Sequence, residues 1–285
     1  MAVYRRNYKP YAGGLTPAWS RFLVLFRYSR RNLFRSKFLT GLFVACFFYP
    51  IVCLVMIYLA HSAGFLKQLG LSSQFLSIDN AFFFHLMSVQ GAFAFLLTAF
   101  VGPGLISPDL ANGALPLYFC RPFSRAEYVL GKSSVLLILL SQVTWVPGVI
   151  LFAIQASFAG ASWTWSNLWI AVSFVISSLL WIAILSLLAM ALSAWVKWRI
   201  VAGAILLGVL FFGAGFAQAV NNVMRTQLGD FLNIVYLMAT VWTSLFGIEA
   251  ERAMPALQAW IAILVYCALC LALLVRKVRA YEVIR

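Results

Sequence analysis

One apolar stretch decides the fold class: residues 167–196 read NLWIAVSFVISSLLWIAILSLLAMALSAWV, 30 residues without a charged side chain. A bilayer core about 30 Å thick is crossed by roughly 20 apolar residues in a helix. A stretch of this length and composition therefore predicts a membrane-spanning helix.

Five further charge-free windows of at least 21 residues meet the same criterion: Phe38 to Ala60, Ala81 to Ser107, Ser133 to Ser157, Ile200 to Val220 and Pro255 to Val275. Over the whole chain 64% of residues are hydrophobic and 10% charged, and the mean hydropathy is +0.95. Soluble domains carry about 45–50% apolar and about 25% charged residues. The sequence predicts an all-α integral membrane protein with a six-helix domain over 38–275, and it excludes a soluble enzyme.

The basic residues predict the orientation of these spans. The chain has 21 Lys and Arg against 7 Asp and Glu, a net charge of +14. With a cytoplasmic N-terminus, the segments 1–37, 107–132, 197–199 and 276–285 face the cytoplasm, and only Lys67, Arg225 and Arg252 lie elsewhere. Positive residues collect on cytoplasmic loops, so we expect both termini inside, and the net charge calls for no nucleic-acid partner. The basic segment before the first span is also unlike a cleavable signal peptide.

The stretch 231–248 is apolar but has only 18 residues. A seventh span here would place the basic tail 276–285 outside, against the positive-inside rule. We therefore expect a re-entrant or interfacial helix on the external side, before the last span.

The basic N-terminal segment predicts an amphipathic helix over about residues 17–35. Thr16 and Pro17 suit a helix start, and one apolar arc of the helical wheel includes Trp19, Phe22 and Phe26, whereas Arg27 and Arg31 lie outside it. Such a helix suits the membrane surface and its lipids. It is either a topology signal alone or also a contact for a partner.

The loop 107–132 combines apolar and charged residues between short segments divided by prolines. Gly102, Pro103, Gly104 and Pro108 are expected to end the preceding helix. The mixture suits docking to a protein; alternatively, the loop packs on its own helix ends. The candidate contact residues are Asp109, Asn112, Tyr118, Arg121, Arg125 and Glu127.

This loop resembles the first cytoplasmic loop of ABC-2 type transporter permeases. The matching positions are Ile106, Asp109, Arg121, Pro122, Ser124, Arg125, Tyr128, Gly131 and Lys132. The resemblance implies that residues around 109–127 form a coupling helix that fits a groove on a cytoplasmic ABC ATPase. It also implies two permease subunits with two ATPase subunits, and cargo passing between the permeases. ATP and Mg²⁺ would then bind in the ATPase.

The sequence contains few residues suited to catalysis or to metal or nucleotide binding. Residues 126–133 lack the first glycine of the phosphate-binding pattern G-x-x-x-x-G-K-[ST], and His85 is the one ionisable Asp, Glu, Lys, Arg or His within the predicted spans. We therefore expect no catalytic residue, no metal site and no cofactor in this chain. Gln90 and Gln142 are candidates for lining a pathway, although polar residues in spans also bond to neighbouring helices.

Two functions fit these observations. The first is the permease of an ABC-2 type exporter in a bacterial inner membrane, where spans free of charge favour an amphipathic or lipid-like cargo. The alternative is a non-transporting scaffold or assembly factor that anchors a cytoplasmic partner through the same loop. Cargo-stimulated ATP turnover would distinguish the two, because a scaffold predicts none.

Overall fold

A computed structural model describes residues 21–62, 77–115, 124–249 and 254–279, and these residues form helices and connecting turns without a strand. Six helical segments are long and apolar enough to cross a membrane: Lys37–His61, Asn80–Ala111, Arg125–Ala159, Ala161–Trp195, Arg199–Met224 and Ala256–Lys277. The all-helical architecture and the six apolar segments predicted from the sequence are confirmed.

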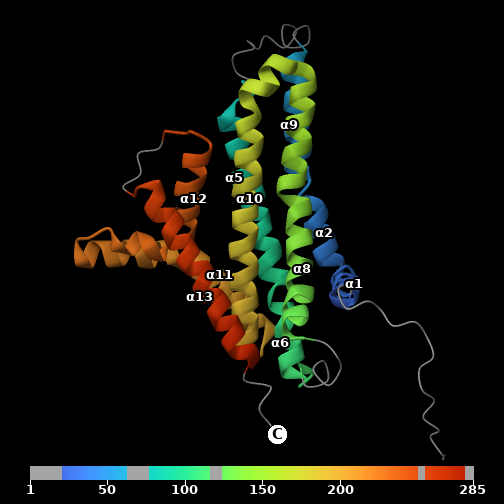
Figure 1. Cartoon of the computed structure of the whole chain (residues 1–285), viewed down its shortest axis with the longest axis vertical. Coiled ribbons are helices and arrows are strands. Elements are labelled where there is room, and N and C mark those ends of the chain that lie inside the picture. Colours follow the sequence, from blue (N-terminus) through green and yellow to red (C-terminus); the bar gives the residue numbers. More distant parts are fainter. Residues whose placement is uncertain (1–20, 63–76, 116–123, 250–253, 280–285) are drawn as a thin grey trace, which may run out of the picture.

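Three of these segments are interrupted helices. A short break separates each pair: α2 (Lys37–Ala45) from α3 (Phe48–His61), α5 (Asn80–Val101) from α6 (Pro103–Ala111), and α8 (Arg125–Val143) from α9 (Trp145–Ala159). By contrast, α10 (Ala161–Trp195) is continuous and lies at the centre of the upright bundle, beside α5, α8 and α9 (Figure 1).

The expectation that Gly102 to Pro108 ends the second helix is confirmed at Gly102 and Pro103, where α5 stops, but not at Pro108. The chain bends at Gly102 and continues as α6 to Ala111, with Pro108 inside the helix. Pro103 is tolerated because the first residue of a helix needs no N–H donor, and neighbouring groups can replace the bond that an internal proline removes. Because α6 ends at Ala111 and α8 begins at Arg125, the segment between these two helices is 112–124, of which 116–123 lie outside the described residues, and it is shorter than the predicted loop 107–132.

Close packing between α9 and α10 depends on Gly148. A Cβ built at this glycine would overlap the ring of Phe174, which is 1% exposed. Overpacking of this kind costs about 1–3 kcal/mol, so the absence of a side chain at Gly148 allows the two helices to approach.

We expect Gly148→Ala to lower the melting temperature of the purified protein, because the Phe174 ring must move. Gly41→Ala is the matched control: Gly41 also lies in a helix, but its Cβ would meet nothing within 4 Å. Alanine there should be neutral or stabilising by about 0.5–1 kcal/mol. Thermal unfolding in detergent checks both variants, and equal effects at the two sites would contradict the packing argument.

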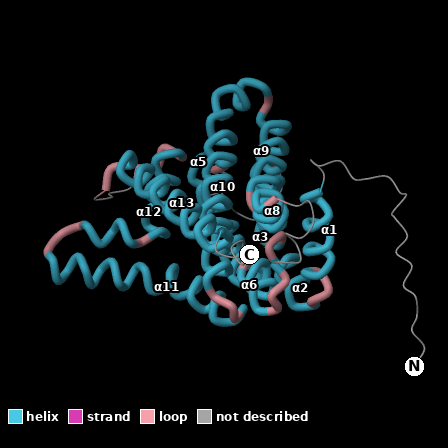
Figure 2. The backbone as a smooth tube through the Cα atoms, turned by 60° about the horizontal axis from the view of Figure 1, so that its bottom comes forward, coloured by secondary structure: helices cyan, strands magenta, loops and turns pink. Residues whose placement is uncertain are grey.

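The fifth apolar segment does not run with the others. Helix α11 (Arg199–Met224) projects sideways from the bundle, and the short helix η3 (Leu228–Leu232) folds back along it (Figures 1 and 2). Asn221 fixes this return, since its Oδ1 accepts from the Gly229 N–H at 2.7 Å and its Nδ2 donates to Asp230 Oδ1 at 2.8 Å. We call residues 199–232 the arm. Length and hydropathy predicted this helix, but they carry no information about its direction.

The stretch 231–248 contains one short helix, α12 (Ile234–Leu245), followed after the connection by α13 (Ala256–Arg279). At 1.5 Å per residue a helix of 12 residues is too short to cross a bilayer core of about 30 Å. Two side chains satisfy carbonyl groups at its end: Ser173 Oγ donates to Leu245 O and Asn80 Nδ2 to Phe246 O, each at 2.7 Å. Protein groups thus satisfy the backbone at the end of α12, and its re-entrant or interfacial position stays a prediction.

Helix α1 (Arg21–Leu33) packs against α8, and its two faces differ as the helical wheel predicts. Phe26 is half-buried against the core, whereas Arg27 and Arg31 are exposed. Trp19 lies outside the described residues, as does the side chain of Phe22. The arginine face is therefore free for a membrane surface or a partner.

Candidate functional site

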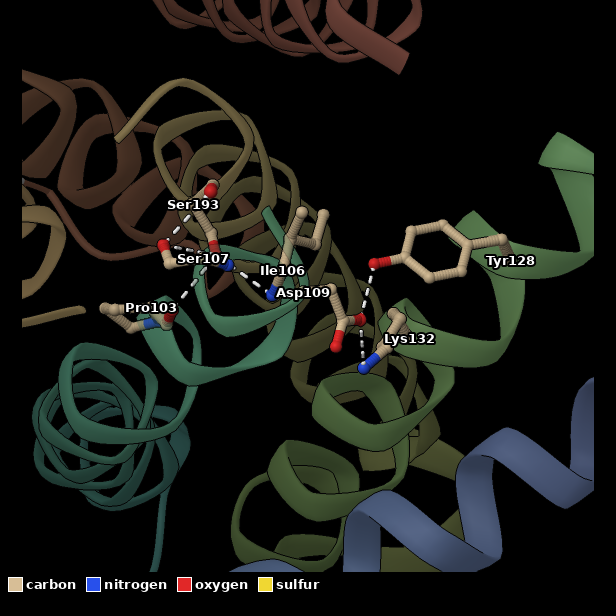
Figure 3. Close-up of polar contacts among 7 residues, drawn as sticks. All are labelled: Pro103, Ile106, Ser107, Asp109, Tyr128, Lys132 and Ser193. Atoms are coloured by element: carbon tan, nitrogen blue, oxygen red, sulfur yellow. Dashed lines mark hydrogen bonds and ion pairs between the residues drawn. The ribbon is translucent and has the colours of Figure 1, made fainter. Parts of the chain in front are cut away.

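Helix α6 leads into the segment 112–124 and is held on two sides, by α10 and by α8 (Figure 3). On the α10 side the buried hydroxyl of Ser193 is inserted into the first turn of α6. It accepts from the Ile106 and Ser107 N–H groups at 3.1 and 2.9 Å and donates to Pro103 O at 3.0 Å. The Ile106 and Ser107 N–H groups, which follow the bend at Gly102, bond to this hydroxyl, so Ser193 acts as a cap on the start of α6 from another helix.

We expect Ser193→Ala to destabilise the protein by about 1–3 kcal/mol, the cost of leaving buried polar groups unpaired. Ser178→Ala is the control on the same helix: Ser178 is equally buried, but its hydroxyl contacts only the weak acceptor Met87 Sδ at 3.2 Å. The melting temperature in detergent measures both. A loss at Ser178 as large as at Ser193 would contradict the proposed cap.

On the α8 side the carboxylate of Asp109 binds two side chains. Its Oδ2 lies 2.8 Å from Lys132 Nζ and accepts a hydrogen bond of 2.8 Å from Tyr128 O–H. The side chains of Lys132 and Asp109 are 9% and 16% exposed, and Tyr128 is fully buried. We call these three residues the Asp109 clamp. Because a buried charge is tolerated only when it is paired, the clamp ties the end of α6 to the start of α8.

The start of α8 is itself fixed by a capping box. Ser124 Oγ accepts from the Glu127 N–H at 3.2 Å, and the Ser124 N–H donates to Glu127 Oε2 at 2.6 Å. Both boundaries of the segment 112–124 are therefore anchored, one by the clamp and the other by this cap. A force applied to the segment would reach α6 and α8 directly.

The structure places the predicted loop residues in different environments. Asp109 belongs to the clamp and Glu127 to the capping box, whereas Asn112 is exposed at the end of α6. Arg125 is the first residue of α8 and is half-buried. Tyr118 and Arg121 lie outside the described residues. Asp109 thus holds the frame of the segment, and Asn112 is the predicted contact residue that the described structure leaves exposed.

The two glutamines predicted to line a pathway differ in environment. Gln90 is fully buried, and its Nε2 donates to Cys46 O at 3.2 Å, next to the break between α2 and α3. Gln142 is exposed on α8. In the described structure Gln90 therefore has a local structural role, and a pathway lined by either residue remains a prediction.

Sequence reasoning missed Ser193 and the pairing of Lys132 with Asp109. Nothing local distinguishes Ser193 from the other serines of α10, because its partners are about 90 residues away. Lys132 did carry a signal, since it directly precedes an apolar run and needs a counter-ion when buried. Glu127 is the nearest carboxylate in the sequence, so the choice of Asp109 as the counter-ion depended on the tertiary structure.

The polar groups of this site bind each other, which is an arrangement for holding helices together. Within the described residues no group of three or more His, Cys, Asp and Glu side chains is arranged to bind a metal ion. No known family model matches the chain. No curated protein is significantly similar to it.

Proposed function

We propose that the chain is the permease subunit of an ABC-2 type transporter, coupled through the segment 112–124 to cytoplasmic ATPase subunits. In this proposal it sits in a bacterial inner membrane with both termini inside. Two permease subunits form the path and export an amphipathic or lipid-like substrate. ATP and Mg²⁺ bind in the ATPase.

The observation that carries the proposal is the convergence of the loop motif. Seven of its nine positions are described. Five of these lie on the helix ends at the base of the segment 112–124, where Asp109 bonds to both Tyr128 and Lys132: Ile106, Asp109, Tyr128, Gly131 and Lys132. All but Asp109 are less than 9% exposed, so these residues cannot form a docking surface themselves. They fit a different role, which is to hold α6 and α8 in place on either side of the segment.

The arrangement of charge supports the proposed orientation. Helix α6, the end of α10 and the end of α13 lie at one end of the bundle (Figure 1), where Lys197, Arg276 and Lys277 are also placed. The opposite end carries the turn at Gly160 between α9 and α10, and the described stretch 145–196, which contains both helices, has no charged residue. Under the positive-inside rule the basic end is cytoplasmic.

The exposed surface of the arm supports the proposal of a second permease subunit. Large apolar side chains on its outer half are highly exposed: Phe211, Phe212, Phe216, Val223 and Met224 are each 62% to 84% exposed. An exposed apolar surface of this kind marks a protein or membrane contact. A second copy packed against the arm would cover these side chains.

Purification from the native host in mild detergent, followed by mass spectrometry, tests the proposal. We expect an ABC ATPase at about one copy per permease, and two permeases in the intact complex by native mass. In liposomes, ATP turnover should rise when cargo is present. Reproducible absence of an ATPase, under conditions that preserve known complexes, would support the scaffold function instead.

A further inference from the structure

A cavity of about 300 Å³ lies where α11 crosses the junction of α5 and α6. This volume is at the lower end of the range for small-molecule sites, about 300–1,000 Å³. One basic residue lies among apolar and small residues in its lining, which includes Phe100, Pro103, Arg199, Gly203, Ala204 and Leu207. The cavity therefore combines apolar walls with a single positive charge.

Arg199 is exposed and contacts the helix junction, where its Nη2 donates to Phe100 O at 3.1 Å. The side chain also lies against Gly104, where a Cβ would come within 3.2 Å of Arg199 Nε. A guanidinium has five N–H donors, so this contact leaves others for a ligand. Within the described part of the chain no carboxylate lies within 4.0 Å of Arg199.

A second feature at the same place also favours an anion. Helix α11 begins at Arg199, and the preceding residue, Trp198, provides no side-chain cap for the first N–H groups. Unpaired N–H groups give a helix N-terminus a partial positive charge, and such termini bind phosphate. The guanidinium and the uncapped terminus act in the same direction.

The surroundings indicate where the anion comes from. Trp195, at the end of α10, and Trp198, directly before α11, are 48% and 74% exposed, and Lys277 Nζ lies 5.1 Å from the centre of the Trp195 ring. Exposed tryptophan and basic residues are typical of the membrane–water interface. A ligand at this interface needs an anionic group for Arg199 and an apolar chain for the cavity walls, and a membrane lipid has both.

We propose that this cavity binds an anionic phospholipid of the adjacent leaflet, with its phosphate on Arg199 and an acyl chain along Phe100 and Leu207. Basic pockets between membrane helices bind such headgroups, and a guanidinium can bind phosphate through two parallel hydrogen bonds. The site does not depend on coupling to an ATPase.

Photolabelling in nanodiscs tests the site with the full chain. The nanodiscs are made of phosphatidylcholine with a small amount of a lipid probe that carries a diazirine on its acyl chain. The probe is phosphatidylglycerol in one sample and phosphatidylcholine in the other. Labelled peptides are mapped by mass spectrometry. We expect about fivefold more labelling of peptides covering 99–107 and 199–207 by the phosphatidylglycerol probe, from the ~1 kcal/mol that one basic residue contributes near an anionic lipid. Equal labelling by both probes would overturn the proposal without any mutation.

Variants then assign the effect to the cavity. Arg199→Gln keeps an amide donor for Phe100 O but removes the charge, so the preference for phosphatidylglycerol should disappear, while Arg199→Lys should keep most of it. Ala204→Phe fills the cavity and should reduce labelling by both probes. Lys197→Gln removes a neighbouring exposed charge outside the lining and is the control. Equal loss of the preference in Lys197→Gln and Arg199→Gln would show nonspecific surface attraction and overturn the site.

Discussion

Asp109→Ala is expected to lower the free energy of unfolding by about 3 kcal/mol, because it leaves the Lys132 ammonium group buried without a counter-ion. Removing one partner of a buried ion pair typically costs 3–5 kcal/mol, and the small exposure of both side chains places this pair at the lower end of that range. The hydroxyl of Tyr128 would lose its acceptor as well. Thermal unfolding in detergent measures the effect.

Two further variants separate the lost charge pair from a general packing defect. In Asp109→Leu with Lys132→Met both charges are gone, and replacement of a buried pair by apolar residues is often neutral or stabilising. This double variant should recover most of the lost stability. Ser133→Ala, next to Lys132, removes a hydroxyl that donates only to Leu130 O of its own helix, and it should have little effect. If the double variant lost as much stability as Asp109→Leu and Lys132→Met lose together when made singly, the two residues would not act as a charge pair.

Replacing Arg121 and Arg125 together with Glu should reduce the amount of ATPase that copurifies by roughly tenfold, and transport should fall with it. The physical reason is that like charges brought together at an interface cost several kcal/mol. Quantitative mass spectrometry of the purified complex gives the ratio of ATPase to permease, and liposome assays give ATP turnover. This prediction depends on the proposed function.

The control for this prediction is Lys197→Glu, which reverses an exposed charge at the same end of the bundle outside the coupling segment. It should leave the ATPase ratio unchanged. Both proteins should elute as single peaks, which separates a loss of docking from a loss of folding. Unchanged assembly and transport in the double Glu variant would remove the docking role from this segment.

The sequence by itself determined which segments are helical and apolar. The long uncharged runs predicted all six segments, and the helical wheel predicted the buried side of Phe26 and the exposed side of Arg27 and Arg31 in α1. These properties follow from the local period of hydrophobic residues and from the bilayer thickness. They need no knowledge of neighbouring helices.

The tertiary structure alone decided which helix lies next to which and where each helix points. Ser193 caps α6 from a distance of 90 residues in the chain, and Lys132 on α8 pairs with Asp109 on α6. Helix α11 projects sideways from the bundle although its hydropathy equals that of a span. Hydropathy is a property of one segment, whereas direction and pairing depend on close contacts between segments, such as the approach of Gly203 to α5, where an added Cβ would lie 3.3 Å from Ala99 O. The site at the base of 112–124 exists only through these distant contacts.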